Sequence, residues 1–351
     1  MKKPLSREEL MQVIEGKGKA SRVPMLYHFW VFPEVFQEKE DQYVQLLDKY
    51  PTDMQVINVN MPSVFDAPED DGSYRWANKD RAQTAGSVGL DAVVAIEDWA
   101  ELDDVLAHFP NADYAGLFRE KPQEDGRYRG AFWCGWLFER LWSLRGMENA
   151  LTDFYLYPEE IHRVFQAFTD FDCRVLERCK RELHTDGIVV TDDIGTQNGP
   201  FFSEEIFLTF FKPYYKRLID KAHSLGMHLW MHSCGNIESY LPHLIEIGLD
   251  VIHPIQKYTM DQQEIARKFG GDISIWAGFD VQQVIPYGSP EEVRAEVRRM
   301  IDTYFREDGR FMLTCGNALT IDCKLASLEA LLEESYAYGS RKAGVSLEKG
   351  E

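Results

Sequence analysis

Three residues in two short motifs have the types and spacing of a metal site. His232-Ser-Cys234-Gly and Cys315-Gly-Asn each follow a short apolar run. Because alternate residues of a strand share a face, His232 and Cys234 would project together from the end of a strand. One imidazole and two thiolates leave a fourth position open, which is typical of catalytic rather than structural zinc. The alternative is that both cysteines are buried thiols of the core.

Composition limits the class of protein. The chain has 351 residues, of which 44% are hydrophobic and 27% charged, as in an ordinary soluble globular protein. Its net charge of -20 argues against nucleic acid and anionic membranes as partners. Six scattered cysteines are too few for a disulfide framework. A polar N-terminus and the lack of any 18-residue apolar stretch predict neither signal peptide nor membrane span, so we expect a cytoplasmic location.

Short apolar runs alternate with long amphipathic runs along the chain. This alternation is typical of strand-helix units around a parallel sheet. We expect eight strands, at residues 23–29, 55–60, 129–135, 187–192, 227–232, 249–253, 273–277 and 311–315. Eight such units predict an α/β fold of the (β/α)8 TIM-barrel type, in a single domain over residues 1–351. The rival is a doubly wound fold, but no Gly-x-Gly-x-x-Gly follows the first strand.

Capping residues predict where several helices begin. Ser203 starts one that runs to about residue 225, and Asp261 starts another. Ser289 with Pro290 behind it is a third start, since proline suits the first helical position.

A long insertion separates the second and third strands. It covers residues 61–128, includes a possible hairpin at 90–96, and would act as a lid or binding loop. The alternative is a surface excursion with no contact to the chemistry. Residues 341–351 are expected to form a flexible, charged tail.

Barrel enzymes carry their chemistry at the C-terminal ends of the strands, so distant motifs can meet at one mouth. His232 and Cys234 end the fifth expected strand, and Cys315 ends the eighth. Asp193 ends the fourth strand and is expected to orient a ligand or to fill the fourth zinc position. The alternative for Asp192 and Asp193 is to cap the following turn.

Other strand ends supply expected substrate contacts. These are His28, Trp30, Gln197 and Asp280. Asp280 is equally suited to cap a helix, and Gln197 to shape its loop.

Several further residues receive less specific interpretations. Four aromatic residues wall a wide cavity or simply pack in the core: Trp30, Phe132, Trp133 and Trp136. A structural role is expected for His253 and for an ion-pair cluster of Glu139, Arg140 and Glu148. The remaining cysteines, Cys134, Cys173, Cys179 and Cys323, are interpreted as ordinary buried thiols.

Six motifs, in their order and spacing, resemble the uroporphyrinogen decarboxylase superfamily over roughly residues 20 to 340. They are Trp136-Leu-Phe-Glu-Arg140, Leu144-Arg-Gly-Met-Glu148, Asp192-Asp-Ile-Gly195, His232-Ser-Cys-Gly-Asn236, Gly248-Leu-Asp-Val-Ile-His-Pro254 and Thr314-Cys-Gly316. The resemblance is closest to the corrinoid-linked branch, typified by methylcobalamin:coenzyme M methyltransferases. It implies a (β/α)8 barrel, in agreement with the strand count.

The two branches of the superfamily differ in their site residues. Decarboxylases carry an arginine-rich motif after the first strand and an essential aspartate after the second. Here no arginine follows Arg22 in the first region, and Asp66 lies in a different context. In the methyltransferase branch, a His-x-Cys pair and a distant cysteine bind zinc, and these match His232, Cys234 and Cys315.

The resemblance therefore implies a zinc-dependent methyltransferase acting between methylcobalamin and a thiol or methylated substrate. Zinc would hold a substrate thiol as the thiolate. The chain has no Asp-x-His-x-x-Gly corrinoid segment, so the corrinoid is expected on a partner protein. A homodimer is possible by analogy with the decarboxylases. Two alternatives stay open: porphyrinogen decarboxylation, and a non-catalytic binder of tetrapyrroles or corrinoid proteins.

Overall fold

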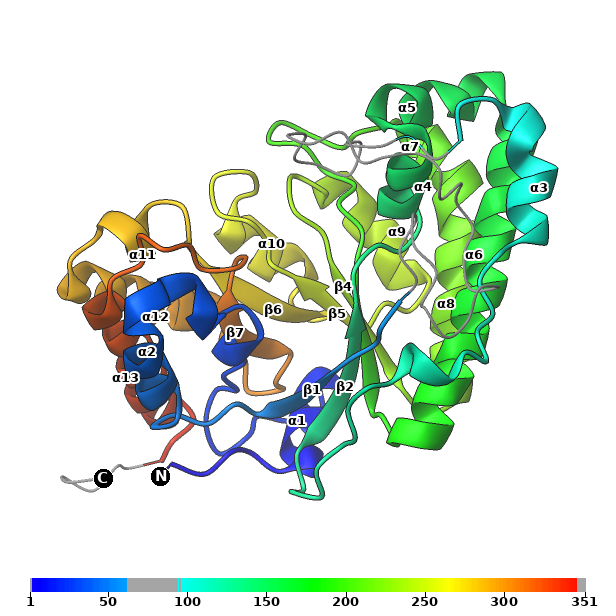
Figure 1. Cartoon of the computed structure of the whole chain (residues 1–351). Coiled ribbons are helices and arrows are strands. Elements are labelled where there is room, and N and C mark those ends of the chain that lie inside the picture. Colours follow the sequence, from blue (N-terminus) through cyan, green and yellow to red (C-terminus); the bar gives the residue numbers. More distant parts are fainter. Residues whose placement is uncertain (1, 62–93, 95, 346–351) are drawn as a thin grey trace.

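A curled sheet of parallel strands forms the centre of the molecule, as the computed structural model shows for residues 2–61, 94 and 96–345 (Figure 1). The strands lie in sequence order, each parallel to its neighbours. They are β1 (Met54–Asn58), β2 (Tyr128–Trp133), β3 (Gly187–Thr191), β4 (His228–His232), β5 (Val251–His253), β6 (Ser274–Phe279) and β7 (Phe311–Cys315). Seven of the eight expected strands are thus confirmed, in a half-barrel consistent with a TIM-barrel-like fold.

The prediction of a strand at residues 23–29 is wrong. Met25 forms one isolated parallel bridge with Leu313 of β7. Its N–H donates to the buried carboxylate of Asp53 at 2.7 Å, and Asp53 also pairs with the buried Arg22. The Asp53 side chain takes the place of a ladder partner for this donor, and the N–H of Asp53 donates to the Met25 carbonyl at 3.2 Å. The chain then turns into the 3₁₀ helix η1 (Tyr27–Phe29), so this segment forms no regular ladder with β1.

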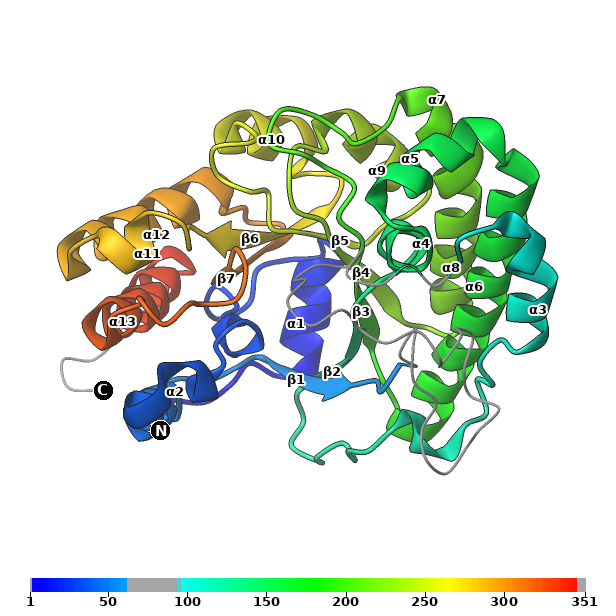
Figure 2. The same ribbon diagram turned by 45° about the horizontal axis from the view of Figure 1, so that its top comes forward.

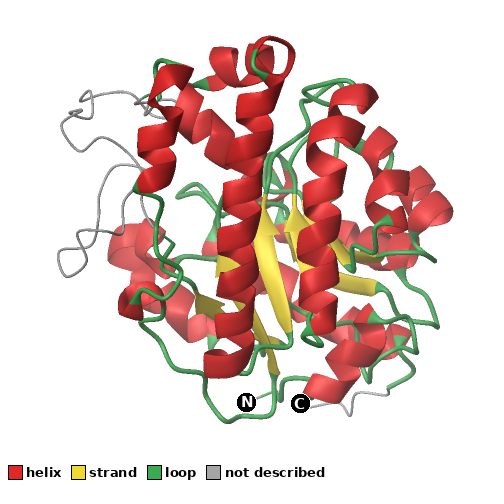
Figure 3. Cartoon of the chain, turned by 90° about the vertical axis from the view of Figure 1, so that its right-hand side faces the viewer, coloured by secondary structure: helices red, strands yellow, loops and turns green. Residues whose placement is uncertain are grey.

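Helices cover the outside of the sheet (Figure 3). They are α1 (Arg7–Ile14), α2 (Glu40–Leu47), α3 (Leu102–Ala107), α4 (Phe138–Arg145), α5 (Met147–Leu156), α6 (Pro158–Arg178), α7 (Glu204–Ile206), α8 (Lys212–Ser224), α9 (Leu241–Glu246), α10 (Gln262–Phe269), α11 (Val284–Tyr287), α12 (Pro290–Tyr304) and α13 (Leu325–Lys342). Among the described residues, none of these helices has the length and apolar character needed to cross a membrane.

The expected helix starts at Ser203, Asp261 and Ser289 are confirmed, since each side-chain oxygen accepts a backbone N–H of the first turn. The helix expected at 203–225 is nevertheless divided. A π-helical turn, Phe207–Phe211, lies between α7 and α8. Pro213 near the start of α8 has no N–H to donate, which explains why the regular hydrogen-bond ladder is interrupted there.

Helix α1 closes the lower end of the half-barrel (Figure 2). The carbonyl of Ile14 accepts from the hydroxyl of Ser274 at the start of β6. The carbonyl of Val13 accepts from the N–H of Arg310 just before β7. These two hydrogen bonds tie α1 to the N-terminal ends of β6 and β7.

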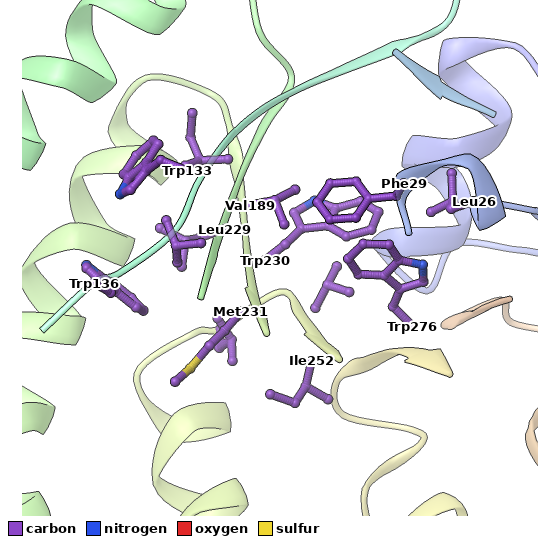
Figure 4. Packing of buried hydrophobic residues seen from close by; sticks show 14 of the residues in the cluster. Leu26, Phe29, Trp133, Trp136, Val189, Leu229, Trp230, Met231, Ile252 and Trp276 are labelled. Atoms are coloured by element: carbon purple, nitrogen blue, oxygen red, sulfur yellow. The ribbon is translucent and has the colours of Figure 1, made fainter. Parts of the chain in front are cut away.

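Aromatic side chains fill the interior (Figure 4). Trp276 makes edge contacts with Phe29 and Trp230, at ring-centroid distances of 5.0 and 5.4 Å. Trp133 and Trp136 lie apart from this group, and Trp136 stacks on Tyr215 of α8 at 4.3 Å. Both are buried in the sheet-helix core. Of the four proposed wall aromatics, these two therefore do not line a central cavity.

The described part of the expected insertion packs on the outer helices. Arg178 of α6 donates to the carbonyls of Ala112 and Tyr114, and Arg145 of α4 donates to that of Ile96. Residues 62–93 and 95, with most of the possible hairpin and Asp66, lie outside the described residues. Arg341 and Lys342, expected in the tail, belong to α13, and residues 346–351 of the expected tail lie outside the described residues.

Candidate metal centre

Three metal-ligating groups meet at the C-terminal edge of the sheet. His232 is the last residue of β4, Cys234 follows it, and Asp193 follows β3. Their ligand atoms all lie within 4.8 Å of one another. His232 Nε2 is 3.3 Å from Cys234 Sγ and 3.5 Å from Asp193 Oδ1. The expected convergence of His232, Cys234 and Asp193 is thus present in the structure.

Two glycines allow the loops that carry these residues to touch. Gly235 has a φ of +85°, and a Cβ there would lie 2.3 Å from the carbonyl oxygen of Gly195. Asn236 N–H donates to the Thr196 carbonyl at 2.7 Å, and Cys234 N–H donates to Asp193 Oδ1 at 2.7 Å. The glycine of the His-x-Cys-Gly motif is therefore required by backbone conformation and close approach.

A relay of hydrogen bonds fixes the tautomer of His232. His253 Nε2 lies 2.9 Å from the carbonyl oxygen of Cys315, which can only accept, so Nε2 carries the hydrogen. His253 Nδ1 is then the acceptor for His232 Nδ1–H, at 2.6 Å. Burial lowers the pKa of both imidazoles, which keeps them neutral. The bare lone pair of His232 Nε2 consequently faces Asp193 and Cys234, as metal ligation requires.

The sequence-based interpretation of His253 as merely structural missed this positioning role. The sequence feature that could have indicated this role is the place of His253 at the end of β5, which pairs with His232 in the parallel register. Paired residues on neighbouring strands project to the same face, so the two rings are neighbours.

Cys234 is the third of the grouped candidate ligands. Without a bound cation its thiol is protonated. Burial, followed by the carboxylate of Asp193, raises its pKa to about 12. The thiol hydrogen is donated to His232 Nε2, and Asn317 Nδ2 lies 3.6 Å from the sulfur. A bound metal would replace that hydrogen, because coordination requires the thiolate.

The three groups fit zinc. Zinc bonds of about 2.0–2.1 Å to nitrogen or oxygen and 2.3 Å to sulfur, in tetrahedral geometry, separate ligand atoms by about 3.3–3.6 Å. The separations of 3.3 and 3.5 Å from His232 Nε2 lie in that range. A nitrogen, a sulfur and a carboxylate oxygen are all ordinary zinc ligands, and three of them leave one position for a substrate.

The structure does not bring the thiol of Cys315 into this set. Cys315 pairs with Phe279 of β6, whereas the inward-facing Trp276 pairs with Met312. Phe279 and Trp276 are three residues apart, so they lie on opposite faces of the sheet. Cys315 is fully buried, and its carbonyl rather than its thiol serves the site. Asp193 is the third member instead, and metal binding by Cys315 remains a prediction.

The sequence-based interpretation placed Glu139 in a structural ion-pair cluster, but its carboxyl group lies close enough to Asp193 to feel that charge. Arg140 pairs with Asp172 at 3.0 Å. Glu139 accepts from the hydroxyl of Thr191, the last residue of β3. Burial, and then the carboxylates of Asp192 and Asp193, raise its pKa to about 8. No local motif indicates this place, because it depends on how α4 packs over β3.

Two other aspartates act as caps. Asp192 accepts three backbone N–H groups at the start of α4, from residues 137 to 139, and the hydroxyl of Tyr215. Asp280 accepts the N–H groups of Gln282 and Gln283 and the hydroxyl of Tyr258. Both aspartates therefore cap backbone, but not where expected: Asp192 caps α4 rather than its own turn, and Asp280 caps the turn before α11, whose N-cap is Gln283.

The expected substrate contacts fall in two separate cavities. Gln197 and Asp280 line one of about 230 Å³, together with Cys234, Lys257 and Asn317. His28 and Trp30 line another of about 730 Å³, between η1 and β1.

Fold and site together define an α/β half-barrel protein with a candidate metal centre at the C-terminal edge of its sheet. The uroporphyrinogen decarboxylase (URO-D) family matches residues 140–338, which is more than half of the chain, and the chain belongs to this family.

Two relatives refine the comparison. A methylated-thiol–coenzyme M methyltransferase of Methanosarcina mazei is 25% identical over 161 residues, or 45% of this chain; the match spans only 41% of that relative's length. A solved structure, a methyltransferase from Methanosarcina mazei, has a TM-score of 0.58 over 96% of this chain and 99% of that chain. The TM-score shows a common fold, and at 12% identity the likeness extends to the fold alone.

Proposed function

We propose that this protein is a zinc-dependent methyltransferase, moving a methyl group between a corrinoid on a separate protein and a thiol or methylated substrate. The observation that carries the proposal is the grouping of Asp193, His232 and Cys234 within 4.8 Å. Membership of the URO-D family and the similarity to a methylated-thiol–coenzyme M methyltransferase support the same reaction class.

Each residue of the centre has a definite task. His232 would offer the Nε2 lone pair, Cys234 its thiolate and Asp193 a carboxylate oxygen, while His253 holds the His232 ring in the required tautomer. A zinc ion bound here would act as a Lewis acid that lowers the pKa of a substrate thiol, so that the thiolate is available at neutral pH.

The cavity beside Cys234 limits what can enter. Its volume of about 230 Å³ is below the usual range for drug-sized ligands, roughly 300–1,000 Å³. A small thiol fits this space and a corrin ring does not. A corrinoid would therefore have to approach the mouth from outside. Lys257 and Asp280 both line the cavity, and the ammonium of Lys257 is paired with Glu296 at 2.8 Å and lies 3.9 Å from Asp280.

Metal content tests the proposal. Wild-type protein should retain about one zinc per chain, and His232→Ala and Cys234→Ala should lose it. Cys173→Ala is the matched control, since Cys173 is a half-buried thiol on α6. Zinc-loaded wild type should then demethylate methylcobalamin in the presence of a small thiol. A folded wild type that neither holds nor takes up zinc would overturn the proposal and favour decarboxylation, which needs no metal.

A further inference from the structure

Four carboxamide side chains line the cavity of about 230 Å³ beside Cys234. They are Gln197, Gln256, Gln282 and Asn317. Each follows a different strand, β3, β5, β6 or β7, so they meet at the C-terminal edge of the sheet. A carboxamide is uncharged and can both donate and accept hydrogen bonds. We call this space the amide pocket, because these groups make it polar without adding charge.

Two of the four amides have their oxygen committed to the backbone. Gln256 Oε1 accepts the N–H of Gly235 at 2.8 Å, and Asn317 Oδ1 accepts the N–H of Ala318 at 2.7 Å. Because a backbone N–H can only donate, these bonds fix which end of each amide is the oxygen. The NH2 groups of both side chains are left as donors, and Asn317 Nδ2 lies 3.6 Å from Cys234 Sγ. The amide pocket therefore suits a ligand that carries an oxygen acceptor.

Charged side chains around the amide pocket compensate one another. Lys257 and Asp280 are the charged residues among the described residues that line it. Lys257 Nζ lies 2.8 Å from a carboxylate oxygen of Glu296 and 3.9 Å from Asp280. Arg299 pairs with the same Glu296 at 2.7 Å. Two cations thus face two carboxylates, and the described lining offers an anionic ligand no unpaired cation.

The metal centre supplies no net positive charge either once it is filled. Zinc with the carboxylate of Asp193 and the thiolate of Cys234 is neutral overall, because His232 ligates as an uncharged imidazole. A thiol that binds there as the thiolate releases its proton to solvent and leaves one negative charge beside the amide pocket. A second negative charge on the same small molecule would be repelled by the first and by Asp280. An uncharged polar group avoids that repulsion.

We propose that the amide pocket selects a small thiol whose second polar group is an uncharged oxygen acceptor, such as a hydroxyl or an amide carbonyl. The NH2 group of Gln256 donates to that acceptor, and the carboxylate of Asp280 disfavours an anionic group in its place. This inference rests on the proposed function, because the metal holds the thiol.

Thiol binding to cobalt(II)-loaded full-length protein tests this selectivity without methyl transfer. Cobalt(II) replaces zinc, which has a filled d shell and no visible absorption, and charge-transfer absorption from the new sulfur–cobalt bond reports binding. Three probes share an ethane skeleton: 2-mercaptoethanol carries a hydroxyl, 2-mercaptoethanesulfonate carries an anion, and ethanethiol carries neither. Each dissociation constant is referred to the thiolate form, so that differences in the intrinsic pKa of the three thiols cancel.

We expect 2-mercaptoethanol to bind about tenfold more tightly than the sulfonate, and severalfold more tightly than ethanethiol. Asp280→Asn keeps the oxygen that caps the turn before α11 but removes its charge, so the ratio of the first two affinities should move about fivefold toward the sulfonate. Asp261→Asn is the matched control, since Asp261 caps α10 in the same way outside the amide pocket. It should leave that ratio unchanged.

A second variant tests the hydrogen-bond donor. Gln256→Glu keeps an acceptor for the N–H of Gly235 but removes the NH2 group. The advantage of 2-mercaptoethanol over ethanethiol should then fall to within about twofold, because both probes are uncharged and differ only in the hydroxyl.

Four results would overturn the proposal: no thiol binding to the cobalt-loaded protein, equal or tighter binding of the sulfonate, equal affinity for 2-mercaptoethanol and ethanethiol, or wild-type ratios in both variants when circular dichroism shows them folded. Protein that takes up neither cobalt nor zinc would overturn it together with the proposed function. Selective thiol binding without methyl transfer from methylcobalamin would support it and count against the proposed reaction alone.

Discussion

Replacing His253 by phenylalanine should weaken zinc binding without removing a ligand. The variant keeps a ring that can pack against Trp30 but lacks the acceptor for His232 Nδ1–H. Without zinc, His232 can then move its hydrogen to Nε2 and donate to Asp193, which lies 3.5 Å away. Zinc binding would force the hydrogen back to Nδ1, where it has no partner.

The size of the expected loss in zinc affinity follows from the hydrogen bond between His232 and His253. Leaving one buried donor unsatisfied costs about 1–3 kcal/mol. Losses of about 10- to 100-fold in metal affinity are typical when a residue that supports a ligating histidine is replaced. We therefore expect the dissociation constant for zinc to rise about 10- to 100-fold in His253→Phe. The loss should be smaller in His253→Asn, whose amide oxygen can replace Nδ1 as acceptor.

Competition with a chromophoric zinc chelator measures these constants. His162→Phe is the matched control, since His162 is a half-buried histidine of α6 that stacks on Phe210. It should bind zinc like the wild type, and His232→Ala should show no high-affinity site. A folded His253→Phe whose affinity lies within twofold of the wild type would refute the relay.

Three further predictions concern ligands and stability. Cys315→Ala should retain about one zinc by metal analysis; loss of zinc would mean that Cys315 displaces Asp193 from the set. Gly235→Ala should lower the free energy of unfolding in urea by about 1–3 kcal/mol, because of its positive φ and the nearby Gly195 carbonyl, while Gly199→Ala, with open space around it, should not. Burial raises the pKa of Asp172 from 3.8 to about 6. The carboxyl group therefore loses its proton at a higher pH in the folded state than in the unfolded state. Its contribution is then most favourable below about pH 4 and falls by up to about 3 kcal/mol as the pH rises through 6, and an unchanged pH slope in Asp172→Asn would contradict this account.

Periodicity in the sequence was sufficient to predict most of the sheet and all three residues of the centre, Asp193, His232 and Cys234. Buried strands such as 187–191 and 311–315 are short apolar runs, and their ends give the C-terminal edge. His232 and Cys234 were predictable because their spacing of two keeps them on one face. The seven strands also place Asp193 at the same edge.

The sequence-based predictions that were wrong concern features that depend on contacts between segments distant in the sequence. The first expected strand is reduced to a single bridge at Met25, whose N–H donates to the Asp53 side chain, before the chain turns into η1. Cys315 ends the expected strand, but its face depends on the register of β7 against β6. The place of Glu139 follows from helix packing. None of these arrangements leaves a periodic signal in its own segment.

The acceptor at residue 315 has an evolutionary consequence. The group that orients His253, and through it His232, is a main-chain carbonyl. Every amino acid carries that group, so mutation of codon 315 cannot delete it as long as β7 keeps its path. Sequence drift at this position is therefore uncoupled from the tautomer of His232, and natural selection on Cys315 would act through its thiol or its volume alone.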